Sequence, residues 1–106
     1  MIKVIFLVHR RPGLSREEFR RYWRETHAPI ASKIPGLRKY TQHHAVSGPD
    51  GAEPAYDGFA EMWWDDAGSL QTALESSEGI AAVADIEDIV DVDRHHVFYV
   101  EQRSIV

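Results

Sequence analysis

The N-terminal segment Ile2–His9 constrains the fold more than any other part of the sequence. It reads Ile-Lys-Val-Ile-Phe-Leu-Val-His, and apolar side chains, many of them β-branched, occupy both sets of alternate positions. Successive side chains of a strand point to opposite faces of a sheet, so a strand with this pattern is buried on both faces. The segment therefore predicts a central strand.

A helix is expected after the turn at Pro12-Gly13. Ser15 and Glu18 have the spacing of a capping box, in which each side chain satisfies a free backbone N–H at the start of a helix. The residues that follow place bulky side chains on one helical stripe, at Phe19, Tyr22, Trp23, Thr26, His27 and Ile30. Pro29 lies in or near the turn that ends this helix, and Pro35-Gly36 marks a firm break.

The rest of the chain predicts three more strands and a helical region in two pieces. Their expected ranges are strands at 37–46, 57–64 and 95–104 and helical pieces at 67–74 and 80–89. The order βαββαβ is typical of the α+β ferredoxin-like fold, an antiparallel sheet with both helices on one face. We expect the strand order 4-1-3-2, which places the first strand inside. At 106 residues, the chain 1–106 predicts a single domain.

Charge and composition exclude several classes of function. The chain has 17 acidic and 12 basic side chains, a net charge of −5, which disfavours nucleic acid as a partner. Cysteine is absent, which excludes disulfides and thiolate chemistry. No apolar run approaches the roughly 20 residues of a membrane helix, and no signal peptide is seen, so we expect a cytoplasmic protein without membrane contact. The acidic side chains of residues 85–93 are interpreted as a solvated helix face.

Two helices cover only one face of such a sheet, and this predicts a homodimer. The first strand is apolar on both sides, and Phe59 and Trp63 share a parity opposite to that of Met62 and Trp64. An uncovered apolar face and two free edge strands favour self-association. We expect two copies to pack through the sheet face and the edge strands into a shared barrel with two-fold symmetry.

Two sequence elements resemble the EthD family of the dimeric α+β barrel superfamily. The first is Phe19-Arg-Arg-Tyr-Trp23-Arg-Glu-Thr-His27-Ala-Pro29, and the second is Ile34-Pro-Gly-Leu-Arg-Lys-Tyr40. The third expected strand, Tyr56–Asp65, also fits the family pattern. The resemblance implies a dimeric barrel with a pocket between the helices and the sheet of each protomer. Related methyl-lactone isomerases use a cysteine in the third strand, and the matching position here is Met62, which disfavours that mechanism.

The resemblance and the helical stripe together give a candidate site for a small, mostly apolar cyclic or aromatic molecule. His27 is the candidate general acid or base, and Tyr40 is the candidate for polarising a substrate oxygen. The candidates for substrate binding are Trp23, Arg38, Met62 and Trp64. The implied chemistry is isomerisation, dehydration or cyclisation by proton transfer, with no cofactor. The alternative is a non-catalytic accessory or ligand-carrying protein with the same pocket.

Each of these residues also has a structural interpretation. His27 could be a core histidine bonded to a backbone carbonyl near Pro29, and Tyr40 could close the core with its hydroxyl at the rim. The tryptophans and Met62 could be plain core, and Arg38 an ordinary surface residue. Glu61 is expected to face the dimer side and to pair with Lys39 or Arg103. The histidine pairs at 43–44 and 95–96 are expected at the subunit junction as hydrogen-bonded groups, with no metal site.

Overall fold

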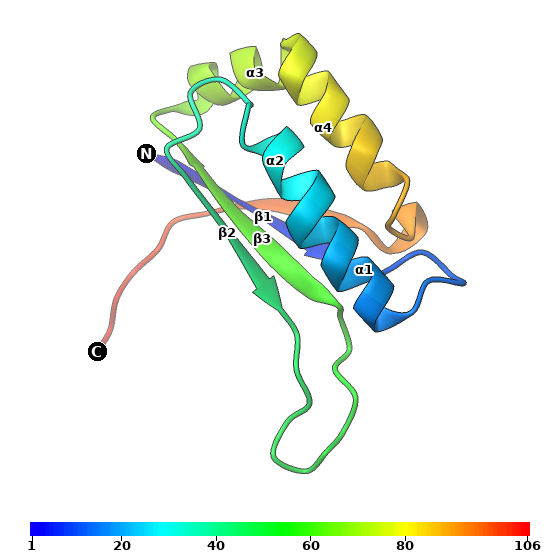
Figure 1. Cartoon of the computed structure of the whole chain (residues 1–106). Coiled ribbons are helices and arrows are strands. Elements are labelled where there is room, and N and C mark those ends of the chain that lie inside the picture. The colour runs from blue at the N-terminus through cyan, green and yellow to red at the C-terminus, as the bar shows by residue number, and fades with distance from the viewer.

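A four-stranded antiparallel sheet forms the base of the molecule. The computed structural model describes all of residues 1–106 (Figure 1). Its strands are β1 (Ile2–Val8), β2 (Lys39–His44), β3 (Gly58–Trp64) and β4 (His96–Val100), in the order β2-β3-β1-β4. This is the predicted order read from the opposite edge, and β1 is central, as its apolar pattern indicated. The last strand is shorter than expected, because residues 101–106 leave the sheet as an exposed extension.

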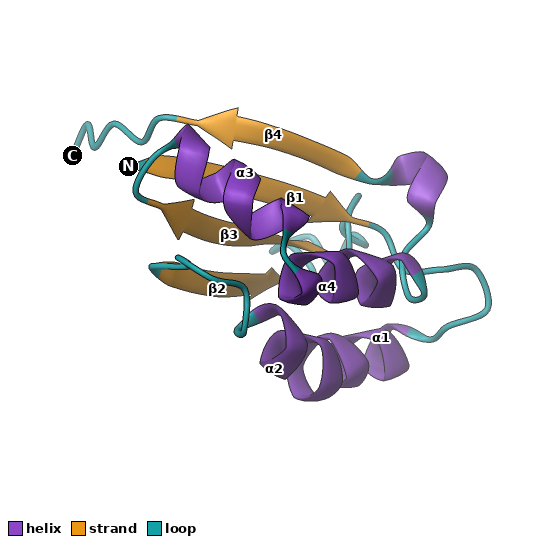
Figure 2. Cartoon of the chain, turned by 90° about the horizontal axis from the view of Figure 1, so that it is seen from above, coloured by secondary structure: helices purple, strands orange, loops and turns teal.

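All helices lie on one face of this sheet (Figure 2). The first helical region comprises α1 (Arg16–Tyr22), a π-helical turn η1 (Trp23–His27) and α2 (Ala28–Ala31), and the second comprises α3 (Ala67–Glu75) and α4 (Ser77–Glu87). A short 3₁₀ turn, η2 (Val92–Arg94), precedes β4. The Ser15 hydroxyl accepts a hydrogen bond from the Glu18 amide, which confirms the predicted cap. The interruption expected between the helical pieces at 67–74 and 80–89 is a single residue, Ser76.

The first helical region widens into a π turn immediately before Pro29. Proline has no amide proton, so Pro29 cannot donate the α-helical bond to the carbonyl four residues earlier. Just before it, the Ala28 amide donates to the Trp23 carbonyl, five residues away. Such π turns frequently occur at functional sites. Here the turn carries both Trp23 and His27, and both side chains are buried.

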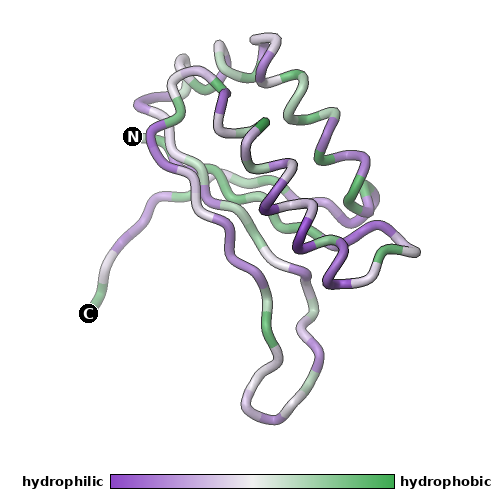
Figure 3. Tube along the Cα trace, viewed as in Figure 1, coloured by the Kyte–Doolittle hydropathy of each residue, from purple (hydrophilic) through white to green (hydrophobic).

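The core between the helices and the sheet consists of two apolar clusters. One is centred on Met62 and Trp64, and the other on Phe19 and Trp23. Phe6 and Tyr40 pack against both clusters and join them. Hydrophobic segments run along the sheet under the helices, while the helices alternate between hydrophobic and hydrophilic stretches (Figure 3). This alternation is the amphipathic pattern of helices that cover one sheet face.

The opposite face of the sheet has no helices over it. The register places Ile5, Glu61 and Thr41 on adjacent strands of this face, with Phe98 opposite Ile5. Glu61 faces away from the helices, as its parity predicted, but its expected partners were wrong. Its carboxylate pairs with Lys3 Nζ at 2.7 Å and with His43 Nε2 at 3.2 Å. Lys3 lies diagonally from Glu61 on the neighbouring strand, since Ile5 is the residue directly opposite Glu61 and Lys3 is opposite Trp63. Neither Lys39 nor Arg103 forms an ion pair with Glu61.

None of the helices combines the length and the apolarity needed to cross a bilayer.

Candidate functional site

A small cavity lies between the helices and the sheet, at the junction of the two core clusters. Its volume is about 50 Å³. The helices and the sheet both contribute to its wall, and almost every contributing side chain is apolar or aromatic. The lining residues are Phe6, Val8, Trp23, His27, Ala31, Ile34, Tyr40, Ala60, Met62, Trp64, Leu74, Ala82, Val83 and Ile86. The cavity is therefore an apolar space into which His27 and Tyr40 bring ionisable groups.

The imidazole of His27 is buried in this wall and hydrogen-bonded to a carboxylate. Its Nδ1 lies 2.8 Å from Oδ2 of Asp85 on α4. The side chains are 8% and 14% exposed, so the bond is largely shielded from water. The expected alternative, a backbone carbonyl near Pro29 as the partner, is wrong. The solvated acidic face expected for residues 85–93 is also wrong at Asp85. Its side chain points inward and contacts His27.

Tyr22 completes this cluster from the same helical region as His27. Its hydroxyl donates to the other oxygen of Asp85, Oδ1, at 2.7 Å. The hydrogen bond to Asp85 raises the pKa of the Tyr22 phenol, with burial adding to the effect. Burial lowers the pKa of His27, and the hydrogen bond and negative charge of Asp85 act in the opposite direction. His27 is therefore neutral near pH 7, with a carboxylate fixed on one ring nitrogen.

Tyr40 approaches the cavity from the sheet side and belongs to a second polar chain. Gln42 Nε2 donates to the Tyr40 oxygen at 2.7 Å and to the Trp23 carbonyl at 2.8 Å. The Gln42 Oε1 atom lies 2.9 Å from His44 Nε2. Burial raises the pKa of Tyr40, and the Gln42 hydrogen bond partly opposes that rise. The Tyr40 proton has no protein acceptor, so it is free to donate to a group in the cavity.

The structure brings five of the six predicted site residues to one cavity. His27, Tyr40, Trp23, Met62 and Trp64 all line it. The indole N–H of Trp64 donates to the Pro35 carbonyl at 3.0 Å, which fixes that ring in the wall.

Arg38, the sixth predicted site residue and a candidate for substrate binding, does not line the cavity. It precedes β2 on the surface, where its guanidinium donates to both oxygens of Asp65 at 3.0 and 2.8 Å. Both side chains are at least half exposed. The pairing holds Arg38 at the outer edge of the sheet, away from the cavity.

Sequence reasoning missed Asp85, Tyr22 and Gln42 as partners of the site. A signal for Asp85 was available in the sequence. It stands three residues after Ala82 and four before Ile89, and both of these are buried. An acidic residue on the buried stripe of a helix needs a polar partner, which His27 supplies. Gln42 shares its strand parity with Tyr40, but the sequence does not indicate that its amide reaches a π-turn carbonyl.

The cavity wall contains no cluster of side chains arranged as metal ligands. Nowhere in the structure do three histidine, aspartate or glutamate side chains come together in an arrangement suited to a metal ion. The chemistry that the residues present can perform is proton transfer and hydrogen bonding, centred on one imidazole and one phenol.

Comparison with known proteins places this geometry in a family. The model of the EthD domain matches residues 11–93, which include both helical regions and the strands β2 and β3. The chain belongs to the EthD family. An EthD family protein of Bacillus halodurans is 32% identical over 97% of this chain and 99% of its own, with a TM-score of 0.82. No curated protein matches the sequence at a significant level.

More distant structures share the fold of this EthD chain. A dimeric ferredoxin-like protein of Bacteroides fragilis is 14% identical over 95% of each chain, with a TM-score of 0.70. A dimeric ferredoxin-like protein of Thermobifida fusca is 16% identical over 95% of this chain and 90% of its own, with a TM-score of 0.69. These two likenesses confirm the ferredoxin-like α+β fold.

Proposed function

We propose that this EthD protein binds a small, mostly apolar cyclic molecule between its helices and its sheet and moves a proton on it. The observation that carries the proposal is the burial of His27 in the wall of an apolar cavity that Tyr40 also lines. A neutral imidazole in such a place can accept a proton from carbon, and a free phenol proton can stabilise the oxygen that gains charge. No cofactor is needed for this chemistry.

Asp85 and Tyr22 act in this proposal as positioning residues. Because Nδ1 of His27 is held by Asp85, the neutral ring carries its proton on Nδ1 and presents the lone pair of Nε2. Tyr22 occupies the other carboxylate oxygen and so fixes the orientation of Asp85. The same arrangement of a base oriented by a carboxylate recurs in unrelated enzymes.

The reaction that fits these groups is the shift of a double bond next to a carbonyl. His27 Nε2 removes a proton from the carbon beside the carbonyl, and the electron pair of that C–H bond forms an enolate. Tyr40 donates a hydrogen bond to the enolate oxygen. The imidazolium then returns the proton at the far end of the conjugated system, and the enzyme regains its starting state.

Binding requires the cavity to expand. Sites for small molecules usually measure 300–1,000 Å³, and the present volume is about 50 Å³. The cavity must therefore gain roughly 250 Å³ or more. Leu74 and Val83 line it and are 38% and 42% exposed, so α3 and α4 form its outer boundary. We expect the ligand to enter by displacing these two helices.

The isomerisation of α-angelica lactone to its conjugated isomer tests the proposal with a defined probe. We expect accumulation of the conjugated lactone, followed by its ultraviolet absorbance, and a 10²- to 10⁴-fold lower rate in His27→Gln. Tyr40→Phe should lose rate while the probe still binds. Arg38→Ala is the matched control and should retain the full rate, because its side chain lies outside the cavity.

Binding of the lactone without conversion would support the alternative function, a non-catalytic ligand-carrying protein. Binding is measured from amide shifts in a ¹H–¹⁵N spectrum. A His27→Gln variant that keeps its fold and most of its rate would remove His27 from the proton-transfer step. An absence of shifts at the cavity residues would contradict the proposal for this class of ligand.

The positioning role of Asp85 has a separate test that needs no substrate. The ¹⁵N shifts of the His27 ring report which nitrogen carries the proton. We expect the Nδ1–H form in the native protein and a lower His27 pKa in Asp85→Asn, because the carboxylate that favours the imidazolium is gone. Glu87→Gln, on the same helix, is the control. An unchanged ring pKa in Asp85→Asn would show that Asp85 does not tune His27.

The proposal includes a homodimer formed through the open sheet face. Apolar side chains gather there around the Lys3–Glu61 pair, and Phe98 on β4 is 41% exposed. The two neighbours of the same fold that are described as dimeric support a homodimer, and the choice of the open face rests on its apolar side chains. Sedimentation equilibrium should give twice the chain mass, and Phe98→Asp should shift it to one chain mass. A native protein of one chain mass at 100 μM would contradict the dimer. A cytoplasmic location remains a prediction, tested by cell fractionation.

A further inference from the structure

A second pocket lies at the end of β1 and shares no lining residue with the apolar cavity. Its volume is about 330 Å³. The β1–α1 loop, the β2–β3 loop and η2 form its walls, and its lining is mostly polar. Four arginines and three carboxylates line it, whereas the whole chain has a net charge of −5. The pocket is thus a locally cationic place on an acidic protein.

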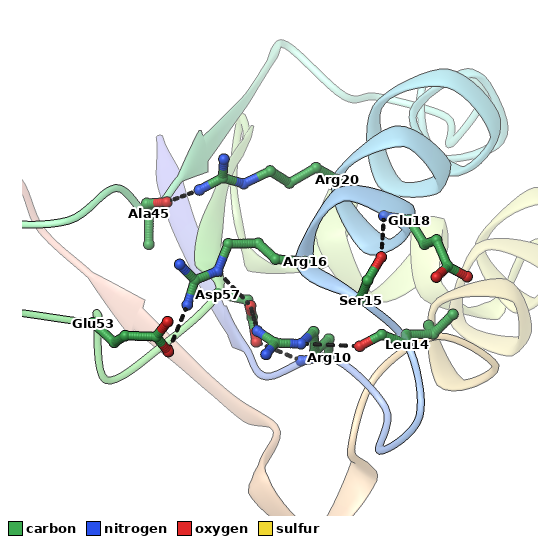
Figure 4. A network of polar contacts seen from close by, with 9 residues as sticks. All are labelled: Arg10, Leu14, Ser15, Arg16, Glu18, Arg20, Ala45, Glu53 and Asp57. Atoms are coloured by element: carbon green, nitrogen blue, oxygen red, sulfur yellow. Dashed lines mark hydrogen bonds and ion pairs between the residues drawn. The ribbon is translucent and has the colours of Figure 1, made fainter.

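One ion pair forms a fixed part of this pocket (Figure 4). The carboxylate of Asp57 accepts from the Arg10 amide at 2.8 Å and from Arg10 Nη1 at 2.6 Å. Arg10 also donates from Nε to the Leu14 carbonyl at 3.1 Å. Each charge of this pair is therefore compensated within the protein. The pair ties the start of β3 to the β1–α1 loop and leaves the other arginines to act on a ligand.

The neighbouring Arg16 is incompletely satisfied. Its Nε is buried without a hydrogen bond, and the nearest acidic oxygen, Asp57 Oδ1, is 3.8 Å away. Its Nη2 lies 3.3 Å from Glu53 Oε2, and the Glu53 side chain is 81% exposed (Figure 4). A long contact to an exposed residue of a loop is weak. Glu53 therefore occupies a position that a better carboxylate can take.

His9 and Arg94 supply two further groups without partners. His9 is only 8% exposed, lines the pocket and makes no side-chain hydrogen bond. Arg94 lines the same pocket and forms no ion pair. Burial and the positive charge of Arg94 lower the pKa of His9, while Asp57 and Asp91 act in the opposite direction. The neutral His9 ring offers one N–H donor, and the Tyr56 ring lies beside it with the ring centroids 4.5 Å apart.

From these unpaired groups we infer that the pocket binds a small carboxylate with a flat apolar body. The carboxylate would accept hydrogen bonds from Arg16 and His9 in the position where Glu53 now approaches, with Arg94 adding positive charge. The flat body would lie against the Tyr56 ring, which benzoate-sized molecules suit in shape and volume. This site is independent of the proton-transfer proposal, because none of its residues lines the apolar cavity.

Titration of the native protein with benzoate tests the inference, with amide shifts in a ¹H–¹⁵N spectrum as the readout. We expect saturable shifts at Gly13, Ala55 and Tyr56. Arg94→Gln should raise the dissociation constant severalfold, because it removes a positive charge beside the bound carboxylate. Glu53→Gln should lower the dissociation constant severalfold, because it removes the competing carboxylate. Glu78→Gln and Arg103→Gln are the charge-matched controls and should change neither value.

Four results would overturn the inference. The first is the absence of saturable shifts up to 20 mM benzoate in the native protein. The second is shifts centred on His27 and Tyr40, which would place benzoate in the apolar cavity. The third is equal binding of benzamide, which would remove the role of the negative charge. Inorganic phosphate serves as a further arm, and tighter binding of phosphate than of benzoate would contradict the assignment to a carboxylate.

Discussion

The two faces of the sheet are built from alternate residues of the same strands, yet aromatic and charged side chains have different surroundings on each face. Trp63 and Trp64 are neighbours in β3. Trp64 is completely buried under the helices, and its N–H donates to a backbone carbonyl. Trp63 lies on the open face, where its N–H has no partner and two lysine ammonium groups lie 4.8 and 5.8 Å from its ring centroid.

The same contrast holds for the ion pairs of the two faces. On the covered face, the pair of His27 and Asp85 is enclosed by the protein's own helices. On the open face, Lys3 and Glu61 are 11% and 19% exposed in a single chain, although no helix covers them. The Lys3 ammonium also donates to Gln102 Oε1 at 3.1 Å. The apolar side chains of the covered face are buried within one chain. The open face leaves apolar side chains exposed, as surfaces that bind a second protein do. The proposed site and the proposed dimer interface therefore occupy opposite sides of one sheet.

The largest expected effect is the difference in stability between replacing Trp64 and replacing Trp63. Trp64→Ala should reduce the free energy of unfolding by about 4 kcal/mol, since it empties a closely packed core position. Trp63→Ala should reduce the stability of a single chain by about 1 kcal/mol or less and should mainly weaken dimerisation. Urea unfolding at low protein concentration and sedimentation equilibrium separate the two effects. Equal losses of stability would contradict the contrast between the faces.

A smaller effect is expected from the ion pair on the open face. Glu61→Gln should cost about 2 kcal/mol of stability, because it leaves the poorly exposed ammonium of Lys3 without its counter-ion. A double variant, Lys3→Met with Glu61→Leu, should recover most of that loss, since apolar side chains fit this face. A double-mutant cycle by urea unfolding measures the coupling. A double variant as unstable as Glu61→Gln would show that the pair itself is required.

The covered face should show a pH dependence that comes from His27. Burial lowers the pKa of His27 in the folded protein, with Asp85 opposing it, so the unfolded chain binds the proton more tightly. Stability is then fully present above about pH 6.5 and declines as the pH falls below that value. His27→Gln should make the decline shallower. His9, His44 and His95, whose pKa values are also lowered by burial, account for the remaining slope.

The smallest effect is expected at the exposed pair of Arg38 and Asp65. Arg38→Ala should leave the urea midpoint within measurement error, because solvent screens a pair whose side chains are both at least half exposed. The stability change in Arg38→Ala is the reference value for an exposed ion pair, against which the ion pairs of both sheet faces are compared. A clear loss of stability would indicate that the N-terminal end of β2 depends on Arg38 more than its exposure suggests.

Most of the fold could be predicted from local patterns in the sequence. The two-sided apolar pattern of Ile2–Val8 indicated a central strand, and the Ser15–Glu18 spacing indicated the helix start, because both depend only on neighbouring residues. The π turn could not be predicted in this way. Pro29 signals a disturbed helix, but whether the helix ends or widens depends on the contacts that Trp23 makes with the sheet and His27 makes with α4.

The candidate site was predictable only in part. His27, Tyr40 and the aromatic wall follow from side-chain periodicity, which reports the direction of a residue. The partner of His27 comes from α4, 58 positions along the chain, and periodicity carries no information on such pairings. Arg38 shows a second limit of periodicity. Its parity was correct, but the nearby Asp65 holds it at the surface.

The second helical region bends at one residue, Ser76, which joins α3 to α4. Its hydroxyl accepts from the Gly79 amide at 3.0 Å and donates to the Ala73 carbonyl at 2.5 Å, so one residue ends α3 and begins α4. A methyl group on Gly79 would overlap the Ala73 carbonyl, which keeps the bend tight. The angle at this bend sets how far Leu74 and Val83 stand from the sheet. In related chains, the size of molecule that the proposed site admits would then change with the angle of this bend, without any change in the residues that line the cavity.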